Sequence, residues 1–346
     1  MPKVLLTGGS GFIAAHVLDI LLKRGYEVIT TVRSETKATQ IRTKYPNAPL
    51  SVAIVPDIAA PNAFDDVLAQ NGSGLDYVQH TASPFHYKWK DARTEVLDPA
   101  INGTNSVFAA IAKHAPAVKR VVVTSSFAAI ITEGDLVNPA RTFSEADWNP
   151  STYEDGLTGA PATTYRVSKK YAEKAAWDFV KNKPGFDVAT ICPPMVFGPV
   201  AHHLDSLSGI NTSNSRFVDL IQGKWKTEIP NSGVFVWVDV RDVAEAHVRA
   251  MELPEAGGKR FFTTAGYYDN RSILRVVSAA KVPELVEKDA LPTDVDAVKG
   301  APGADFAQEK VHKFDNAFTT KTLGISWTPL EKTAVDTVKS LLQIPA

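Results

Sequence analysis

A glycine-rich segment at residues 8–14 constrains the fold of this chain more than any other feature. The segment reads GGSGFIA, follows the short apolar run Val4–Thr7 and opens residues 12–24, whose apolar side chains recur at helical spacing. Glycine lets the backbone turn tightly and approach a phosphate, and the free N–H groups of a helix start attract anions. This order predicts the first βαβ unit of a dinucleotide-binding domain, the alternative being a tight turn without a ligand. The loop residues expected to contact the dinucleotide are Gly8, Ser10, Gly11, Phe12 and Ile13.

The rest of the first half alternates between strand and helix patterns. Further strands are predicted at 28–32, 52–55, 77–81, 121–124 and 188–192, with helices at 35–45, 63–70, 96–114 and 164–182. Such alternation is typical of an α/β fold with a Rossmann-like, doubly wound parallel sheet. After Pro193 the pattern becomes irregular. We therefore expect a Rossmann domain over residues 1–193, to which a segment near 234–251 returns, and a mainly substrate-binding lobe over 194–346.

Composition and charge exclude several classes of protein. The chain is 44% apolar and 22% charged, as in globular proteins, and its net charge of -1 gives no basic surface for nucleic acid. No apolar stretch approaches the roughly 20 residues that cross a bilayer. A single cysteine, Cys192, excludes an internal disulfide, and the eight histidines form no metal signature. We expect a cytoplasmic protein with no metal and neither nucleic acid nor membrane as a partner.

Two cations follow the second predicted strand. Arg33 ends that strand, and Lys37 lies one helical turn further on. An acidic residue here would bind the ribose 2′-hydroxyl of NAD, whereas arginine suits the 2′-phosphate of NADPH. The pair therefore predicts NADPH as the cofactor. The alternative is a solvated pair of surface cations, and Glu35 between them would weaken the case if it faced the same side.

An acidic residue also follows the third predicted strand. Asp57 there can meet the amino group of adenine while its apolar neighbour Ile58 flanks the ring. An aspartate that caps the backbone before Ala59 explains the same residue nearly as well. The sequence leaves both interpretations open.

The residues that could carry chemistry are a tyrosine and a lysine four positions apart. Tyr165 and Lys169 share one face of the predicted helix 164–182, and the nearby cation lowers the pKa of the phenol toward the range of a proton donor. Ser126 closes the run after strand 121–124, at the sheet edge where ligands bind, and its hydroxyl can orient a carbonyl. Each signal alone is weak, but their order along the chain is specific.

With these motifs the chain resembles the extended short-chain dehydrogenases/reductases. The resemblance is strongest to the branch of dihydroflavonol and cinnamoyl-CoA reductases, and within it to the yeast NADPH-dependent methylglyoxal and aldehyde reductases. It covers nearly the whole chain. The segments that carry it are 7–14, 32–34, 55–58, 80–84, 120–126, 165–177, 196–199 and 238–243.

The resemblance implies a role for each site residue. Ser126 would polarise the carbonyl, Tyr165 would donate the proton, and Lys169 would hold the nicotinamide ribose and lower the pKa of the tyrosine. Further cofactor contacts would come from Thr81, Ala82, Ser83, Pro193, Val196 and Ser213. An apolar substrate pocket would be formed by Phe85, Phe127 and Met195, unless these residues are ordinary core. Many relatives carry Asn at position 192 and another residue at 195, which puts the substrate preference in doubt.

The expected function is NADPH-dependent reduction of hydrophobic ketones or aldehydes to chiral alcohols. The partner would be a small-molecule carbonyl compound, and the enzyme a monomer or homodimer. Two alternatives share the fold: an NAD-dependent sugar-nucleotide epimerase or dehydratase, and a non-catalytic dinucleotide sensor. The cations at positions 33 and 37 and the apolar pocket residues argue against the first, and the Tyr/Lys pair argues against the second.

Overall fold

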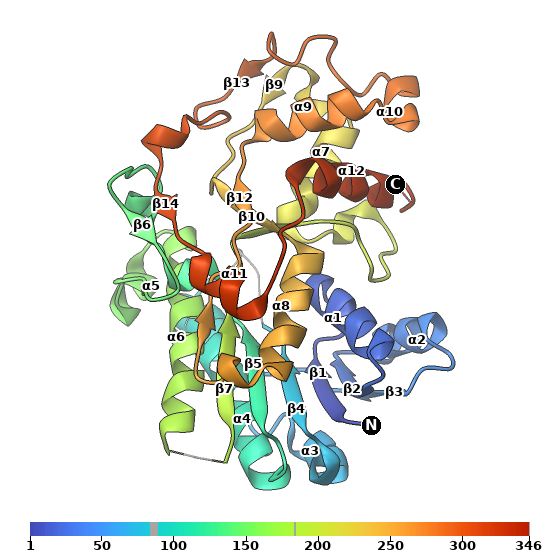
Figure 1. Cartoon of the computed structure of the whole chain (residues 1–346), viewed down its shortest axis with the longest axis vertical. Coiled ribbons are helices and arrows are strands. Elements are labelled where there is room, and N and C mark those ends of the chain that lie inside the picture. The colour runs from blue at the N-terminus through green and yellow to red at the C-terminus, as the bar shows by residue number, and fades with distance from the viewer. Residues whose placement is uncertain (84–88, 183–184, 346) are drawn as a thin grey trace.

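A central parallel sheet organises the molecule (Figure 1). The computed structural model describes residues 1–83, 89–182 and 185–345. Seven strands lie in the order β11-β7-β5-β4-β1-β2-β3, and every neighbouring pair is parallel. The strands are β1 (Lys3–Thr7), β2 (Glu27–Val32), β3 (Leu50–Ile54), β4 (Tyr77–His80), β5 (Arg120–Thr124), β7 (Asp187–Ile191) and β11 (Arg260–Phe261). The predicted Rossmann-like sheet is confirmed.

Helices cover both faces of this sheet because successive strand residues point to opposite sides. Val4 and Leu6 of β1 pack in one cluster with α1 and α8, whereas Leu5 between them packs on the other face with α4. The first face carries α1 (Phe12–Lys23), α2 (Glu35–Lys44) and α8 (Val240–Glu252). The second carries α3 (Asp65–Asn71), α4 (Asp98–His114) and α6 (Pro161–Asn182). The sheet is thus buried on both sides, as a doubly wound fold requires.

A second core lies above the carboxyl edge of the sheet (Figure 1). It surrounds a three-stranded sheet in the order β12-β10-β8. Its main elements are β8 (Met195–Phe197), β10 (Val236–Asp239), β12 (Gly266–Tyr267), α7 (Ser215–Ile221), α9 (Asn270–Ala280) and α12 (Leu330–Leu341). The remaining short elements are β6 (Thr142–Phe143), β9 (Glu228–Ile229), β13 (Lys299–Gly300), β14 (Lys313–Phe314), α5 (Tyr153–Thr158), α10 (Pro283–Glu287) and α11 (Ala317–Leu323).

The chain crosses between the two cores more than once. It leaves the central sheet after β7, builds β8 and β10 in the second core, and returns with α8 and β11. Strand β10 therefore lies in the smaller sheet, while α8, which follows it directly, packs against α1. The division at residue 193 stays a prediction.

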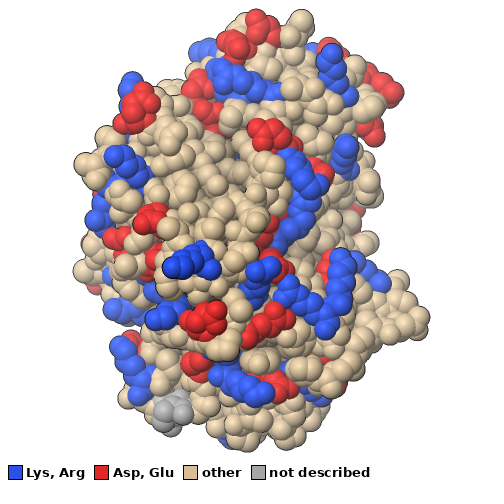
Figure 2. Space-filling model, in the orientation of Figure 1, with Lys and Arg blue, Asp and Glu red and all other residues tan. Residues whose placement is uncertain are grey.

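Figure 2 shows the charged side chains on one face of the molecule. Acidic and basic side chains are interspersed over this face. Among the helices of the described residues, none has the length and apolar character needed to span a membrane.

Candidate active site

The glycine loop forms a tight cradle after β1. Gly8 has φ +75°, a conformation that L side chains rarely adopt, and its carbonyl accepts a hydrogen bond from the Gly11 N–H at 2.8 Å. A Cβ on Gly9 would lie 2.0 Å from Thr30 Oγ1 of β2. Glycine is therefore needed at position 8 for the turn and at position 9 for the close approach of the loop to the neighbouring strand.

A groove of about 910 Å³ opens in front of this loop, along the carboxyl ends of β1 to β4. Most of the predicted cofactor contacts line it. They are Gly8, Ser10, Gly11, Phe12, Arg33, Lys37, Asp57, Ile58, Thr81, Ala82 and Ser83. Four neighbouring strand ends thus contribute to one elongated site, as in dinucleotide-binding sheets.

The two predicted phosphate-binding cations face this groove without competition from the acid between them. Arg33 is exposed, and Lys37 lies in the first turn of α2. Glu35 turns to Arg42 instead, with 2.5 Å between its Oε1 and the arginine Nη1. The side of the groove that holds Arg33 and Lys37 therefore keeps its positive charge.

Asp57 makes the capping contact, and its contact with adenine stays a prediction. Its Oδ1 accepts a hydrogen bond from the Ala59 N–H at 2.9 Å, which is the local capping contact. The exposed residue also lines the groove beside Ile58. Capping fixes the carboxylate at the rim, where it can still receive a donor from a ligand.

Buried hydrogen bonds below the groove hold the end of β4 against β1. Thr7 Oγ1 lies 2.9 Å from His80 Nδ1 and accepts the Ala82 N–H at 3.1 Å, while Thr81 Oγ1 donates to the Thr7 carbonyl at 2.5 Å. Burial lowers the pKa of His80 to about 3, so its ring is neutral at physiological pH. His80 is a packing residue, and Thr7 is a supporting residue that the sequence analysis did not identify.

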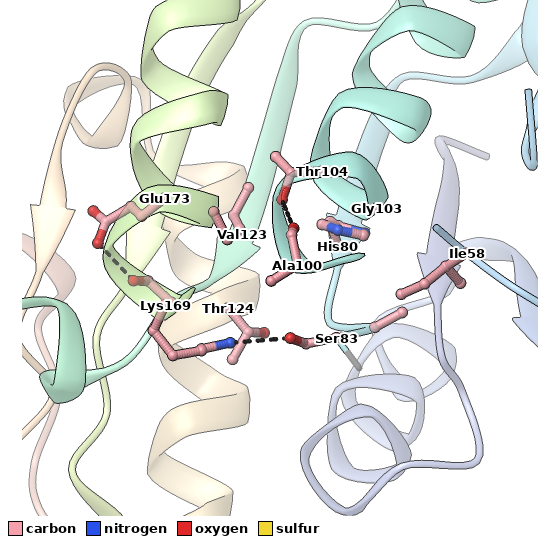
Figure 3. Close-up of a pocket in the computed structure, with 13 residues that line it drawn as sticks. Ile58, His80, Ser83, Ala100, Gly103, Thr104, Val123, Thr124, Lys169 and Glu173 are labelled. Carbon is pink, nitrogen blue, oxygen red and sulfur yellow. Dashed lines mark hydrogen bonds between the residues drawn. The ribbon is translucent and has the colours of Figure 1, made fainter. Parts of the chain in front are cut away.

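The predicted catalytic lysine contacts a residue that lines the groove. Lys169 Nζ donates to Ser83 Oγ at 3.3 Å, and Figure 3 shows both side chains meeting from α6 and from the segment after β4. Burial lowers the pKa of Lys169 to about 8, against the opposing pull of the Glu173 carboxylate. At neutral pH most molecules therefore carry Lys169 in its ammonium form.

Ser126 and Tyr165 lie on two elements that pack against each other. Helix α6 contacts the 3₁₀ helix Phe127–Ala129, which begins directly after Ser126. The Ser126 hydroxyl oxygen accepts the Ala128 N–H at 3.1 Å, and the Phe127 N–H donates to the Pro193 carbonyl at 2.9 Å. Tyr165 is half-buried one turn before Lys169. Ser126 is thereby fixed between the Tyr/Lys helix and the corner after β7.

Some predicted cofactor contacts are not among the described residues that line the groove. They are Ile13, Tyr165, Lys169, Pro193, Val196 and Ser213. The lining instead draws on the segment 202–211, which includes His202 and Asn211. This segment has no periodicity and no motif, so only the fold brings it to the groove.

The structure describes two of the three predicted pocket residues, and these two differ in burial. Phe85 lies outside the described residues. Phe127 is 2% exposed and stacks on Phe262 with ring centroids 4.9 Å apart, so its side chain belongs to a packed aromatic cluster. Met195 on β8 is half-buried. The pocket role of all three stays a prediction.

Comparison with known proteins places the chain among reductases. The profile of the NAD dependent epimerase/dehydratase family matches residues 4–263. The chain is 44% identical to the ketoreductase azaE of Aspergillus niger over 99% of this chain and 98% of that protein. It is 34% identical to the NADPH-dependent methylglyoxal reductase GRE2 of Saccharomyces cerevisiae over 99% and 98%. The structure of yeast methylglyoxal/isovaleraldehyde reductase Gre2 complexed with NADPH superposes with a TM-score of 0.89, at 33% identity over 99% and 98% of the two chains.

Proposed function

The chain belongs to the NAD dependent epimerase/dehydratase family, and we propose that within it the protein is an NADPH-dependent carbonyl reductase of hydrophobic ketones and aldehydes. The relatives that are named a ketoreductase and an NADPH-dependent methylglyoxal reductase match this chain almost end to end. Their names describe the reduction of a carbonyl group to an alcohol. This is the reaction for which the Tyr165/Lys169 pair is suited.

The groove fits NADPH by its shape and its charge. The backbone cradle at Gly8 and Gly11 suits a pyrophosphate, and the cations Arg33 and Lys37 suit a 2′-phosphate, since Glu35 between them pairs with Arg42. Asp57 and Ile58 are positioned for the adenine end, and Lys169 for the nicotinamide ribose. When bound, NADPH supplies the hydride.

The chain's own residues supply the proton and orient the carbonyl group of the substrate. The Ser126 hydroxyl donates a hydrogen bond to the carbonyl oxygen and fixes which face of the carbonyl meets the cofactor. The Tyr165 phenol transfers its proton to the same oxygen as negative charge develops there. The Lys169 ammonium stabilises the phenolate that remains, and solvent then returns the proton to it.

The contact between Lys169 and Ser83 is the observation that carries this proposal. It brings the Tyr/Lys face of α6 to a residue that lines the groove beginning at the glycine loop. A sensor that only bound the dinucleotide would need the groove but would have no use for a half-buried tyrosine and lysine beside it.

The decisive experiment follows the loss of NADPH absorbance with methylglyoxal and with an aryl ketone. We expect turnover that requires the carbonyl compound, a single enantiomer of the alcohol in excess, and near-complete loss of turnover in Tyr165→Phe. Intact NADPH binding without turnover on any carbonyl compound of the panel would overturn the proposal.

The family's name makes a sugar-nucleotide epimerase or dehydratase the second candidate. Such an enzyme regenerates its dinucleotide in each cycle, so it consumes no NADPH. Net oxidation of NADPH in the presence of a ketone separates the two functions. The cations beside the groove favour the reductase, because retained NAD has no 2′-phosphate to pair with them.

The location and assembly belong to the same proposal. We propose a cytoplasmic enzyme that works as a monomer or homodimer on a small-molecule substrate. One buried cysteine and a net charge of -1 support a reducing compartment and no polyanionic partner. Light scattering coupled to size exclusion measures the assembly, and cell fractionation measures the location.

A further inference from the structure

A buried carboxylate lies one helical turn beyond the predicted catalytic lysine. Glu173 on α6 is 1% exposed, four residues after Lys169 and eight after Tyr165. Residues at this spacing share one face of a helix, and Figure 3 shows Glu173 one turn from Lys169 on α6, with the lysine side chain extending toward Ser83. An ionised carboxylate in such a place is costly unless it is paired and hydrogen-bonded.

Donors from several elements converge on the Glu173 carboxylate. Its Oε2 accepts the Ser125 hydroxyl at 2.5 Å, and its Oε1 accepts the Thr190 hydroxyl at 2.8 Å and the Trp177 indole N–H at 3.2 Å. Arg260 donates to both oxygens, at 2.7 and 3.2 Å. The side chain therefore connects α6 to the ends of β5, β7 and β11 at a single point.

The counterion of Glu173 is itself immobilised. Arg260 also donates to the backbone carbonyls of Glu145 and Asp147, both at 2.6 Å, and its guanidinium lies 3.8 Å from the ring centroid of Trp148. Burial alone would raise the pKa of Glu173, but the charge of Arg260 and the hydrogen bonds hold it below its ordinary value. Glu173 is consequently ionised throughout the physiological range.

We infer that Glu173 is a positioning residue of the catalytic centre, one that keeps Lys169 in its ammonium form and locks Ser125, the neighbour of Ser126, against the Tyr/Lys helix. The catalytic part of this inference rests on the proposed carbonyl reductase function. The electrostatic part concerns the protein alone and can be measured without a substrate.

The burial of Lys169 makes its ammonium form sensitive to the charge of a neighbouring carboxylate. Desolvation has already lowered the pKa of this lysine to about 8, and the negative charge of Glu173 opposes the shift. Among the residues that the structure describes, the other titratable groups near it are His80, Cys192 and Tyr165, with Arg260 paired to the Glu173 carboxylate. Burial keeps His80 and Cys192 neutral at this pH, since their pKa values are about 3 and about 12. Glu173 is thus the anion that sustains the ammonium form.

The test compares Glu173→Gln with the parent protein by the pH dependence of Lys169 acylation. Acetic anhydride modifies only the neutral amine, and peptide mass spectrometry reads each lysine separately. Loss of the carboxylate charge should move the half-point of Lys169 acylation down by about one pH unit. The exposed Lys181 serves as the internal reference and should not move. In the NADPH assay the alkaline limb of kcat/KM should shift in the same direction.

Two further variants separate this role from mere packing. Thr190→Val removes one hydrogen bond to Glu173 and no charge, so it should lower stability without moving the half-point. Should Glu173→Gln not fold, the double variant Glu173→Gln/Arg260→Met leaves no unpaired buried cation. Because it removes the positive charge together with the negative one, we expect a downward shift that is smaller than in Glu173→Gln.

The outcomes distinguish this inference from the proposed function. An unchanged Lys169 half-point in the folded Glu173→Gln variant or in the double variant would overturn the inference, and Glu173 would then be structural only. If Glu173→Gln lowers the half-point of Lys169 acylation but the parent protein reduces no carbonyl compound, the proposed function is contradicted. The electrostatic role of Glu173 then still stands.

Discussion

Lys169 and Ser83 are 86 positions apart in the chain, and a 3.3 Å hydrogen bond from the lysine Nζ to the serine Oγ brings them together. Because the lysine belongs to the Tyr/Lys helix and the serine lines the groove, this contact joins the proposed catalytic residues to the proposed cofactor site. The pKa of Lys169 is held near 8 by its burial, and the ammonium form is the one that assists the phenol. We therefore expect kcat/KM for ketone reduction to fall as the pH rises through about 8, measured at saturating NADPH.

Replacing Tyr165 by Phe removes the hydroxyl of the proposed proton donor and little else. We expect kcat to fall by about 10²–10⁴-fold, the usual worth of a general acid, with the Kd for NADPH nearly unchanged. Stopped-flow turnover and fluorescence titration of NADPH measure the two quantities. Ser126→Ala is the companion variant and should lose less. A Tyr165→Phe enzyme with parental kcat would refute the mechanism.

Preference for NADPH over NADH should depend on Arg33. Arg33→Ala is expected to weaken NADPH binding by roughly 10–100-fold, since a charge-assisted contact is worth about 1.5–3 kcal/mol, and to leave NADH binding almost unchanged. Arg275→Ala is the matched control, because Arg275 is an exposed cation that pairs with Asp296 and is not among the residues that line the groove. Equal losses for both cofactors in Arg33→Ala would contradict a 2′-phosphate site.

Stability should decrease in acid because of a buried histidine. The ring of His247 lies between Thr124 and Gln79, 2.9 Å from each, and burial lowers its pKa to about 3. Between its ordinary value near 6.5 and about 3, the unfolded chain binds a proton that the folded chain does not. The free energy of unfolding should therefore fall by up to about 1.4 kcal/mol per pH unit for this residue below pH 6.5. Urea unfolding at pH 7.5 and 5.5 measures the slope, which His247→Gln should reduce.

Phe127 and Met195 should respond differently to truncation. Phe127→Ala removes a ring that stacks on Phe262 and contacts Phe143, so we expect a loss of about 3–5 kcal/mol in stability. The half-buried Met195 should lose less stability when changed to Ala, and should shift the KM and the enantiomeric excess for bulky ketones. Melting temperature and chiral analysis of the product on both variants test this division. Unchanged selectivity in Met195→Ala would remove that residue from the pocket.

The parts of the fold that were predictable are those with local causes. The glycine cradle, the alternating strands and helices, and the shared face of Tyr165 and Lys169 each follow from turn chemistry or from periodicity within a few residues. Strand β11 contains only Arg260 and Phe261, too few residues to show alternation, and it joins the sheet only because β7 offers an edge.

Some residues at the candidate site could not be predicted from the sequence, because their contacts depend on distant segments. Glu173 occupies a position of the Tyr/Lys helix that could be predicted, but its partners Ser125, Thr190 and Arg260 come from three separate strands or strand ends. His202 and the rest of its segment reach the groove through the course of the chain between the two cores. Contacts that depend on the packing of distant segments leave no pattern in one sequence.

The late return of α8 and β11 to the central sheet has a consequence for how the chain can be made or divided. A fragment that ended at residue 193 would contain six of the seven strands but would leave the outer edge of β7 unpaired and the apolar surface beneath α8 in water. An open strand edge beside exposed apolar side chains is a template for association with other chains. During synthesis the nucleotide-binding half must therefore wait for residue 261 to emerge, and expressing that half alone should give aggregates rather than a working module.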